Sequence, residues 1–151
     1  MKIVIQRVLE STVSIEGGCN RSINEGLVLF IGFCSEDTEE DVLWGVKKVI
    51  NMKILSDETN NSTLNILDKK TEILVISQFT LLASTKKGNK PSWHKAADQK
   101  LARVLYNQFI DVLKKMYSSK NVKIGFFGKN MQVHLINNGP ITIILDSKNK
   151  L

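Results

Sequence analysis

The chain has 151 residues, of which 42% are hydrophobic, and it carries a formal net charge of +6. That length and apolar content suit one compact domain, residues 1–151, that fills its core without disulfides or a metal. No stretch approaches the roughly 20 consecutive apolar residues of a membrane span, and Met1 leads into Lys2 rather than an apolar leader. The two cysteines form no CxxC motif, which favours a reducing compartment. We therefore expect an unprocessed, soluble, cytoplasmic protein with no membrane attachment.

The excess of lysine and arginine favours a polyanionic partner. Basic side chains near phosphates release condensed counterions on binding, which makes nucleic acid a natural candidate. Many lysine-rich surfaces are only solvated, so charge alone leaves both interpretations open.

The first third of the chain predicts strands followed by a helix. Residues 2–9 and 11–16 alternate apolar and polar side chains, as half-buried strands do, and a Gly-Gly turn follows. Residues 27–33 form a short continuous apolar run, which is typical of a strand buried on both faces. Thr38 and Asp41 have the spacing of a capping box, and apolar residues then recur at helical spacing, which predicts a helix over residues 38–51.

The middle of the chain predicts one strand between two loops. Residues 57–62 are polar and rich in Asn, which indicates a loop, while residues 72–82 return to strand character. Residues 84–92 read STKKGNKPS, with Gly and Pro between three lysines, and therefore predict an exposed basic loop.

The last third predicts a long helix and three closing strands. Residues 96–117 carry an apolar helical face, and residues 123–127, 131–137 and 141–146 have strand character. The last two strands are joined across Asn138-Gly139-Pro140, as in a hairpin. With no repeat or linker in the chain, these elements predict one α/β domain.

No motif for metal or nucleotide chemistry is present. The two histidines, His94 and His134, have no second His or Cys at a ligand spacing and no obvious carboxylate partner. A Ser-His-Asp triad assembled by the fold stays open. The chain has neither GxxxxGK followed by Ser or Thr nor GxGxxG after a strand. We expect no metal and no cofactor.

Two segments place unusual residues where a strand would otherwise continue. The segment SQFTL at 77–81 ends an apolar strand, and its polar groups either cap the backbone or offer donors to a ligand. The segment NNGPIT at 137–142 is either an ordinary hairpin turn or the site of a cis Gly-Pro bond. Such a bond would point two successive carbonyls the same way, so that they could accept hydrogen bonds from an ammonium group.

Several motifs, in order along the chain, resemble the D-aminoacyl-tRNA deacylase family. They are the N-terminal KIVIQRVLESTVSIEG, SQFTL at 77–81, TKKGNKPS at 85–92, GFFGKNMQV at 125–133 and NGPIT at 138–142. Each motif is short, but their common order covers essentially the whole chain. The resemblance implies a mixed, largely antiparallel, barrel-like sheet with two main helices.

The resemblance also implies a homodimer with composite active sites and assigns roles to individual residues. The catalytic pocket for the terminal adenosine and the ester would be lined by Ser77, Gln78, Phe79 and Thr80. Substrate binding would involve Gly139 and Pro140 of the other subunit, as a chirality filter, and Phe127 and Met131, which shape the adenosine pocket. The RNA itself would contact the basic loop through Lys86, Lys87 and Lys90.

In the family's mechanism, the cis Gly-Pro carbonyls hold the α-ammonium group of the substrate. An L-residue would drive its Cβ into Gly139 or Pro140, whereas a D-residue or glycine would fit. The ester is already activated, so the protein need supply only orientation and oxyanion stabilisation, with a backbone N–H near Phe79 or Thr80 as the candidate donor. A Thr80 nucleophile would need a base. We therefore favour activation by the 2′-hydroxyl of the RNA, with Gln78 positioning the end.

Departures from the family pattern are small. Asn138, Ile141 and the Trp93-His94 pair differ from the usual residues, and the Trp93 ring is either a base-stacking platform or a loop anchor.

Three rival functions differ in what they predict. A sibling deacylase for mischarged L-aminoacyl-tRNA has other residues at the positions of Ser77 and Phe79. A nucleic-acid-binding module would bind without cleaving the ester, and a metabolite esterase would be indifferent to the tRNA body.

Overall fold

The chain contains both strands and helices, as expected for an α/β protein. The computed structural model describes residues 1–57, 59 and 62–150. The strands are β1 (Lys2–Ile15), β2 (Asn20–Ile23), β3 (Gly26–Gly32), β4 (Leu55–Asp57), β5 (Ser62–Leu64), β6 (Glu72–Ser77), β7 (Val122–Ile124) and β8 (Met131–Asp146). The helices are α1 (Glu39–Asn51), α2 (Ile66–Lys69), the 3-10 helix η1 (Phe79–Leu82) and α3 (Gln99–Met116). No helix in this described part is long and apolar enough to cross a membrane.

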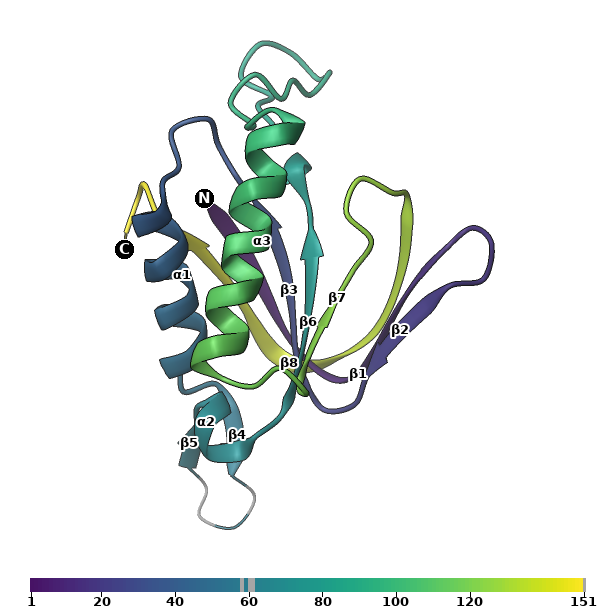
Figure 1. Cartoon of the computed structure of the whole chain (residues 1–151), viewed down its shortest axis with the longest axis vertical. Coiled ribbons are helices and arrows are strands. Elements are labelled where there is room, and N and C mark those ends of the chain that lie inside the picture. Colours follow the sequence, from purple (N-terminus) through teal and green to yellow (C-terminus); the bar gives the residue numbers. More distant parts are fainter. Residues whose placement is uncertain (58, 60–61, 151) are drawn as a thin grey trace.

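The main sheet is organised around the long strand β1 (Figure 1). One edge of β1 pairs with β8, while the other pairs with β3 along its first half and with β2 along its second half, all antiparallel. The order β2-β1-β3-β6-β7 then continues through parallel pairs of β3 with β6 and of β6 with β7. The predicted mixed, largely antiparallel sheet with two main helices is confirmed.

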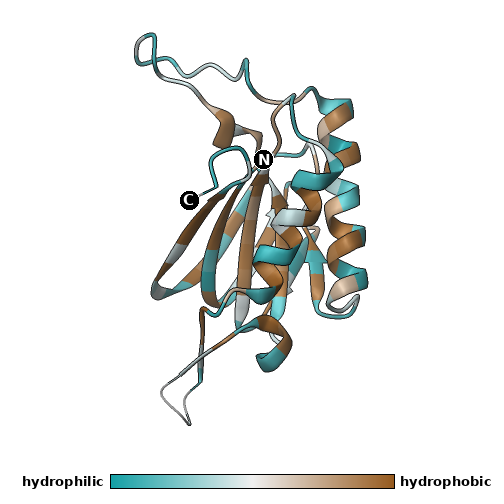
Figure 2. Ribbon diagram, turned by 90° about the vertical axis from the view of Figure 1, so that its left-hand side faces the viewer, coloured by the Kyte–Doolittle hydropathy of each residue, from teal (hydrophilic) through white to brown (hydrophobic). Residues whose placement is uncertain are grey.

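Helices α1 and α3 cover one face of the sheet, as Figure 2 shows from the side. Between this layer and the sheet lies the larger apolar cluster, to which β3 contributes Leu27, Leu29 and Ile31, and α3 contributes Phe109 and Leu113. These side chains are essentially inaccessible to water. Their burial is the main favourable contribution to folding of this layer.

A second, smaller apolar cluster lies on the opposite face of β3 and β6. Its members are Val8, Val13, Ile23, Val28, Leu74 and Ile76. Because β1 and β2 supply three of them, Val8, Val13 and Ile23, the sheet curves over its own outer face and encloses this cluster. The curvature makes the sheet barrel-like.

The start of α1 follows the predicted capping box. Thr38 is the N-cap, and its backbone N–H donates to Oδ2 of Asp41 at 2.9 Å. The same carboxylate accepts from Nζ of Lys148 at 2.8 Å. The first turn of α1 is thereby tied to the residues that follow β8.

The predicted strand over residues 72–82 is wrong beyond Ser77. Pairing of β6 with β3 ends at Ser77 and Ile31, because β3 itself ends at Gly32, and the chain turns into η1. A Cβ at Gly32 would lie 2.6 Å from the carbonyl oxygen of Gln78. Glycine therefore allows η1 to pack against the end of β3.

The predicted hairpin across Asn138-Gly139-Pro140 is also wrong. Residues 131–146 form one strand that pairs with β1 along its length, with two register shifts, on either side of Val8. Gln6 pairs with Thr142 and Val8 pairs with Asn137, so residues 138–141 bulge out opposite the single residue Arg7. The Gly139-Pro140 peptide bond in this bulge is cis.

Several short elements were not predicted from the sequence. One predicted loop is only partly described by the structure. The four-residue strand β2, the β4–β5 pair and the single turn of α2 are too short to show a clear hydrophobic period. Within the predicted loop 57–62, residues 58, 60 and 61 lie outside the described part of the chain, as does residue 151.

Candidate active site

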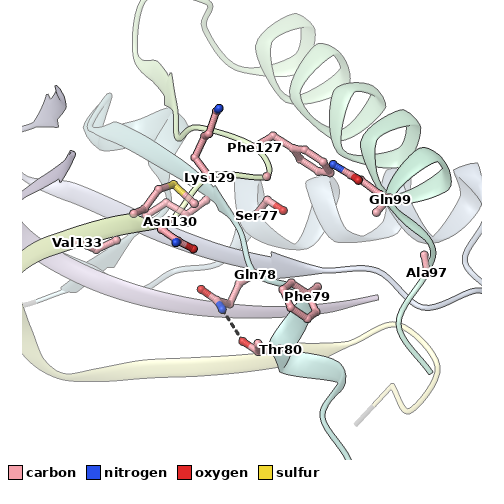
Figure 3. A pocket seen from close by; sticks show the side chains of 14 residues that line it. Ser77, Gln78, Phe79, Thr80, Ala97, Gln99, Phe127, Lys129, Asn130 and Val133 are labelled. Carbon is pink, nitrogen blue, oxygen red and sulfur yellow. Dashed lines mark hydrogen bonds between the residues drawn. The ribbon is translucent and has the colours of Figure 1, made fainter. Parts of the chain in front are cut away.

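A cavity of about 650 Å³ opens where β6 ends. Three segments form its walls: the end of β6 with η1, the start of α3 with the residues before it, and the turn between β7 and β8. The lining includes Met131. Figure 3 labels other lining residues, among them Ser77, Gln78, Phe79, Thr80, Gln99, Phe127, Lys129 and Asn130.

Residues 77–80, which form one wall of the cavity, are anchored to the end of β3. The backbone N–H of Gln78 donates to the carbonyl of Ile31 at 2.7 Å, which fixes the residue where strand pairing ends. The side-chain amide of Gln78 donates to the hydroxyl of Thr80, drawn as the dashed line in Figure 3. Since this hydroxyl accepts from Gln78, its own proton is free to be donated to a ligand.

The opposite wall is formed by Phe127 and Met131. The Phe127 ring lies 5.4 Å from the ring of Tyr106, and the guanidinium of Arg103 lies 4.5 Å above it. The Tyr106 hydroxyl donates to the carbonyl of Val75 at 2.9 Å. Burial raises the pKa of Tyr106 above its ordinary value of 10.0, so this donor keeps its proton. Met131 accepts a hydrogen bond through its sulfur from the backbone N–H of Phe126 at 3.3 Å.

Sequence reasoning missed the contribution of α3 to this wall. Gln99 lines the cavity, and Gln99, Arg103 and Tyr106 recur at i, i+4 and i+7, which places them on one face of the helix. That face contacts the turn around Phe127. The helical spacing was visible in the sequence, but nothing in it indicated that this face meets the 126–130 turn.

The chemistry of the cavity is that of hydrogen bonds and apolar surface. None of the described residues that line it is His, Cys, Asp or Glu, and Lys129 is the one ionisable side chain among them. The cavity of this chain therefore contains no general base beside Thr80. It offers amide, hydroxyl and backbone groups, which can orient a substrate and stabilise charge without transferring a proton.

Gly139 and Pro140 do not line this cavity. They lie exposed on the bulge of β8, where the buried side chain of Arg7 holds the backbone. The Arg7 guanidinium donates to the carbonyls of Asn138 at 3.0 Å and Gly139 at 3.1 Å. It also donates to the carbonyl of Ile54 at 2.7 Å, so one side chain ties the bulge to the segment before β4. A carbonyl has two lone pairs, which leaves Gly139 able to accept a further hydrogen bond.

The basic loop is exposed and separate from the cavity walls. Lys86, Lys87 and Lys90 are solvent-exposed, and the loop is closed by two backbone hydrogen bonds between Ser84 and Ser92, of 2.8 and 3.0 Å. Across the residues that the structure describes, no three His, Cys, Asp or Glu side chains gather where they could hold a metal ion.

A model of the D-Tyr-tRNA(Tyr) deacylase family matches residues 4–146. The chain belongs to this deacylase family. It is 46% identical over 150 residues to proteins named D-aminoacyl-tRNA deacylase from Bacteroides thetaiotaomicron and Bacteroides fragilis, with 99% of each chain covered.

Two solved structures share this deacylase fold. A protein named c-Myc DNA unwinding element binding protein has a TM-score of 0.90 and 39% identity, covering 97% of this chain and 98% of that one. A probable eukaryotic D-amino acid tRNA deacylase has a TM-score of 0.84 at 16% identity, covering 95% and 97%, which shows the fold alone.

The fold brings together some of the residues singled out by the family resemblance and separates others. Ser77, Gln78, Phe79 and Thr80 share one cavity with Phe127 and Met131, which are more than 40 residues further along the chain. Gly139, Pro140 and the three lysines lie elsewhere on the same chain. Their predicted roles stay predictions.

Proposed function

We propose that this chain hydrolyses the ester between a D-amino acid and the terminal adenosine of tRNA, in the cytoplasm. The observation that carries the proposal is the cavity formed by SQFT and the Phe127–Met131 wall. It occurs in a chain that is 46% identical, over 99% of its length, to proteins named D-aminoacyl-tRNA deacylase. Its size suits a terminal nucleoside with a small ester.

The residues of the cavity suit a reaction in which the substrate supplies its own activating group. An aminoacyl ester is reactive, and the adjacent ribose 2′-hydroxyl can assist the attack of water, so the protein needs to orient the ester and stabilise the oxyanion. The backbone N–H groups of Phe79 and Thr80 precede the first hydrogen bond of η1, from Leu81 to Gln78, and are the candidate donors. Gln78, fixed by Ile31 and bonded to Thr80, would position the ribose.

We further propose that the active site is completed by a second copy of the chain. Ile143 and Leu145 pack toward the helix-covered core, and Ile144 between them is 70% exposed on the face that no helix covers. Ile136 and Leu9, also on the β1–β8 pair, are 50% and 52% exposed. Exposed apolar surface of this kind is typical of an interface. Pairing two chains through β8 would bring Gly139 and Pro140 of one toward the cavity of the other.

In the proposed composite site, Gly139 and Pro140 exclude L-amino acids by contact of the backbone with Cβ. Arg7 would keep this backbone in place, since it binds the carbonyls of Asn138 and Gly139. Exclusion by a fixed backbone can discriminate more strongly than the about 1 to 3 kcal/mol available from one missing methylene in an apolar pocket. Glycine has no Cβ, and glycyl-tRNA is the expected side substrate.

The decisive experiment compares the cleavage of D-tyrosyl-tRNA and L-tyrosyl-tRNA by the purified protein in the presence of a chelator. We expect cleavage of the D-ester only, and no effect of the chelator. Equal cleavage of both esters would contradict the chirality filter, and cleavage of neither would contradict the deacylase function.

A second candidate function is nucleic-acid binding without catalysis. The 39% identical solved structure named for binding a DNA unwinding element favours it, together with the exposed Lys86, Lys87 and Lys90. Under this alternative, the protein would bind DNA or uncharged tRNA in a salt-dependent manner and leave D-tyrosyl-tRNA intact. The same deacylation assay therefore separates the two functions.

A further inference from the structure

We propose that Trp93, together with Phe79, forms a stacking surface for the unpaired nucleotide that precedes the terminal adenosine of tRNA. This inference rests on the proposed function and extends it from the ester to the single-stranded 3′ end of the RNA. It assigns a binding role to a residue outside the cavity.

The two rings form a continuous aromatic surface that begins at the cavity. The Phe79 ring lines the cavity and is 55% exposed, and Trp93 is 41% exposed. Their centroids are 5.8 Å apart, with an angle of 65° between the ring planes. A nucleotide strand leaving the cavity past Phe79 would therefore meet the indole ring next.

The backbone around Trp93 is fixed on both sides. Directly before it, Ser92 and Ser84 exchange two backbone hydrogen bonds, and directly after it the N–H of Ala96 donates to the Trp93 carbonyl at 2.9 Å. The N–H of Ala97 then donates to the carbonyl of Phe33 at 2.9 Å, which joins the segment to the end of β3. A large ring that stays exposed on an anchored backbone is suited to ligand contact, because little conformational entropy is lost when a base stacks on it.

The charges around this surface fit a polyanion. Lys86, Lys87, Lys90 and Lys95 all lie exposed in the segment between η1 and α3, which forms the projection at the top of Figure 1. No Asp or Glu occurs between Glu72 and Asp98. Single-stranded nucleic acid is bound by this combination of aromatic platforms for the bases and lysines for the phosphates.

The first test uses tryptophan fluorescence, because the chain contains only two tryptophans. Trp44 lies on α1 and packs against the larger core cluster, so the variant Trp44→Phe leaves Trp93 as the sole reporter. We expect uncharged tRNA to quench this fluorescence at low salt, and the same tRNA without its unpaired 3′ nucleotides to quench it far less. Equal quenching by both RNAs, or none by either, would overturn the inference.

The second test compares two substrates that differ upstream of the ester. Trp93→Ala should lower kcat/KM for D-aminoacyl-tRNA by about 5-fold to 100-fold, chiefly through KM, as expected for one lost base stack. The loss should be much smaller for D-aminoacyl-adenosine, which has no upstream nucleotide, and Trp93→Phe should recover most of the activity on tRNA. Equal losses on both substrates would mean that Trp93 only anchors Phe79, and would overturn the inference.

The two tests also separate this inference from the proposed function. If the unmodified protein cleaves neither substrate, the deacylase function fails, while the quenching by intact and trimmed tRNA still decides whether Trp93 binds the 3′ end. If the protein cleaves D-aminoacyl-tRNA and Trp93→Ala is fully active on it, the function stands and the stacking surface is refuted.

Discussion

Arg7 shows how one side chain can organise a functional segment. It occupies the only β1 position opposite the bulge of residues 138–141, and it is 7% exposed. Its guanidinium, a planar fork of donors, reaches the carbonyls of Asn138, Gly139 and Ile54 at once. In the sequence, Arg7 was only a polar residue in an alternating strand. Its role depends on a register that joins residues more than 130 positions apart.

Arg7→Met should destabilise the protein, because it keeps most of the side-chain volume but leaves these carbonyls without their donor. We expect the free energy of unfolding to fall by about 2 to 4 kcal/mol, measured by chemical denaturation. Lys100→Met, at an exposed position on α3, serves as the control and should change this free energy by less than about 0.5 kcal/mol. Similar effects of the two substitutions would contradict the structural role of Arg7.

Gly139→Ala tests whether glycine is needed at this position for the stability of the fold or for substrate binding in the proposed composite site. A Cβ at Gly139 would meet only the side-chain nitrogen of Asn137, at 3.6 Å, which is an ordinary contact. Thermal unfolding should therefore be nearly unchanged. We expect kcat/KM for D-aminoacyl-tRNA to fall at least about tenfold, because the new methyl group would occupy the space proposed for the substrate. Full activity of this variant would contradict the placement of Gly139 beside the substrate.

At the scale of elements, the capping box of α1 doubles as a link to the C-terminal end of β8. Burial alone would raise the pKa of Asp41, but hydrogen bonds from Lys148, Ser147 and the Thr38 backbone outweigh it and hold the pKa well below its ordinary value of 3.8. A carboxylate whose pKa is lower in the folded state stabilises the fold above its unfolded pKa, and this stabilisation is lost as the pH falls below it.

The pH dependence of stability should report this link. We expect Asp41→Asn to lower the free energy of unfolding at pH 7 by about 1 kcal/mol, on the scale of a lost helix cap. As the pH falls from about 5 to 3, the unmodified protein should lose stability more steeply than the variant, because only it has this carboxylate to protonate. Glu40→Gln, at an exposed position in the same helical turn, should follow the unmodified protein. Parallel pH curves for Asp41→Asn and the unmodified protein would refute the assignment.

At the scale of the whole molecule, the two faces of the sheet differ in what covers them. Helices α1 and α3 cover one face, and the curvature of the sheet encloses part of the other, which leaves the outer side of β8 exposed. The cavity beside η1 and the bulge with Gly139 lie in different parts of the same chain. A symmetric dimer would account for both features. The exposed side of β8 would be buried in the interface, and Gly139 of each chain would lie near the cavity of the other, because a two-fold interface places the same patch on both partners.

Ile144→Asp tests the proposed dimer directly. Ile144 is 70% exposed, so an aspartate there should not disturb the fold of the chain, but a charge buried in the interface should disrupt it. We expect the variant to sediment as a monomer and to lose at least about 90% of the deacylase activity of the unmodified dimer. Leu67→Asp, at a 43% exposed apolar position on α2, should leave both properties unchanged. A monomeric, fully active variant would contradict the composite site.

The sequence by itself determined the features that depend on neighbouring residues. The helix after Thr38, the strand around Leu27–Leu29 and the basic loop around Lys86 were predictable, because capping, hydrophobic period and turn residues act over a few positions. The family motifs added the residues of the cavity, since SQFT and GFFGKNM are themselves local. The turn at Ser77 and the missing hairpin at Gly139 were not predictable in this way. They depend on where β3 ends and on how β8 pairs with β1.

Only the tertiary structure decided which distant residues act together. It placed Arg7 under the bulge of β8, the Tyr106 face of α3 against Phe127, and Trp93 beside Phe79 at the edge of the cavity. Each of these contacts is fixed by the register of strand pairing and by the packing of α3 on the sheet. A shift of one residue in that register would turn every side chain of a strand to its other face, so no local pattern can specify them.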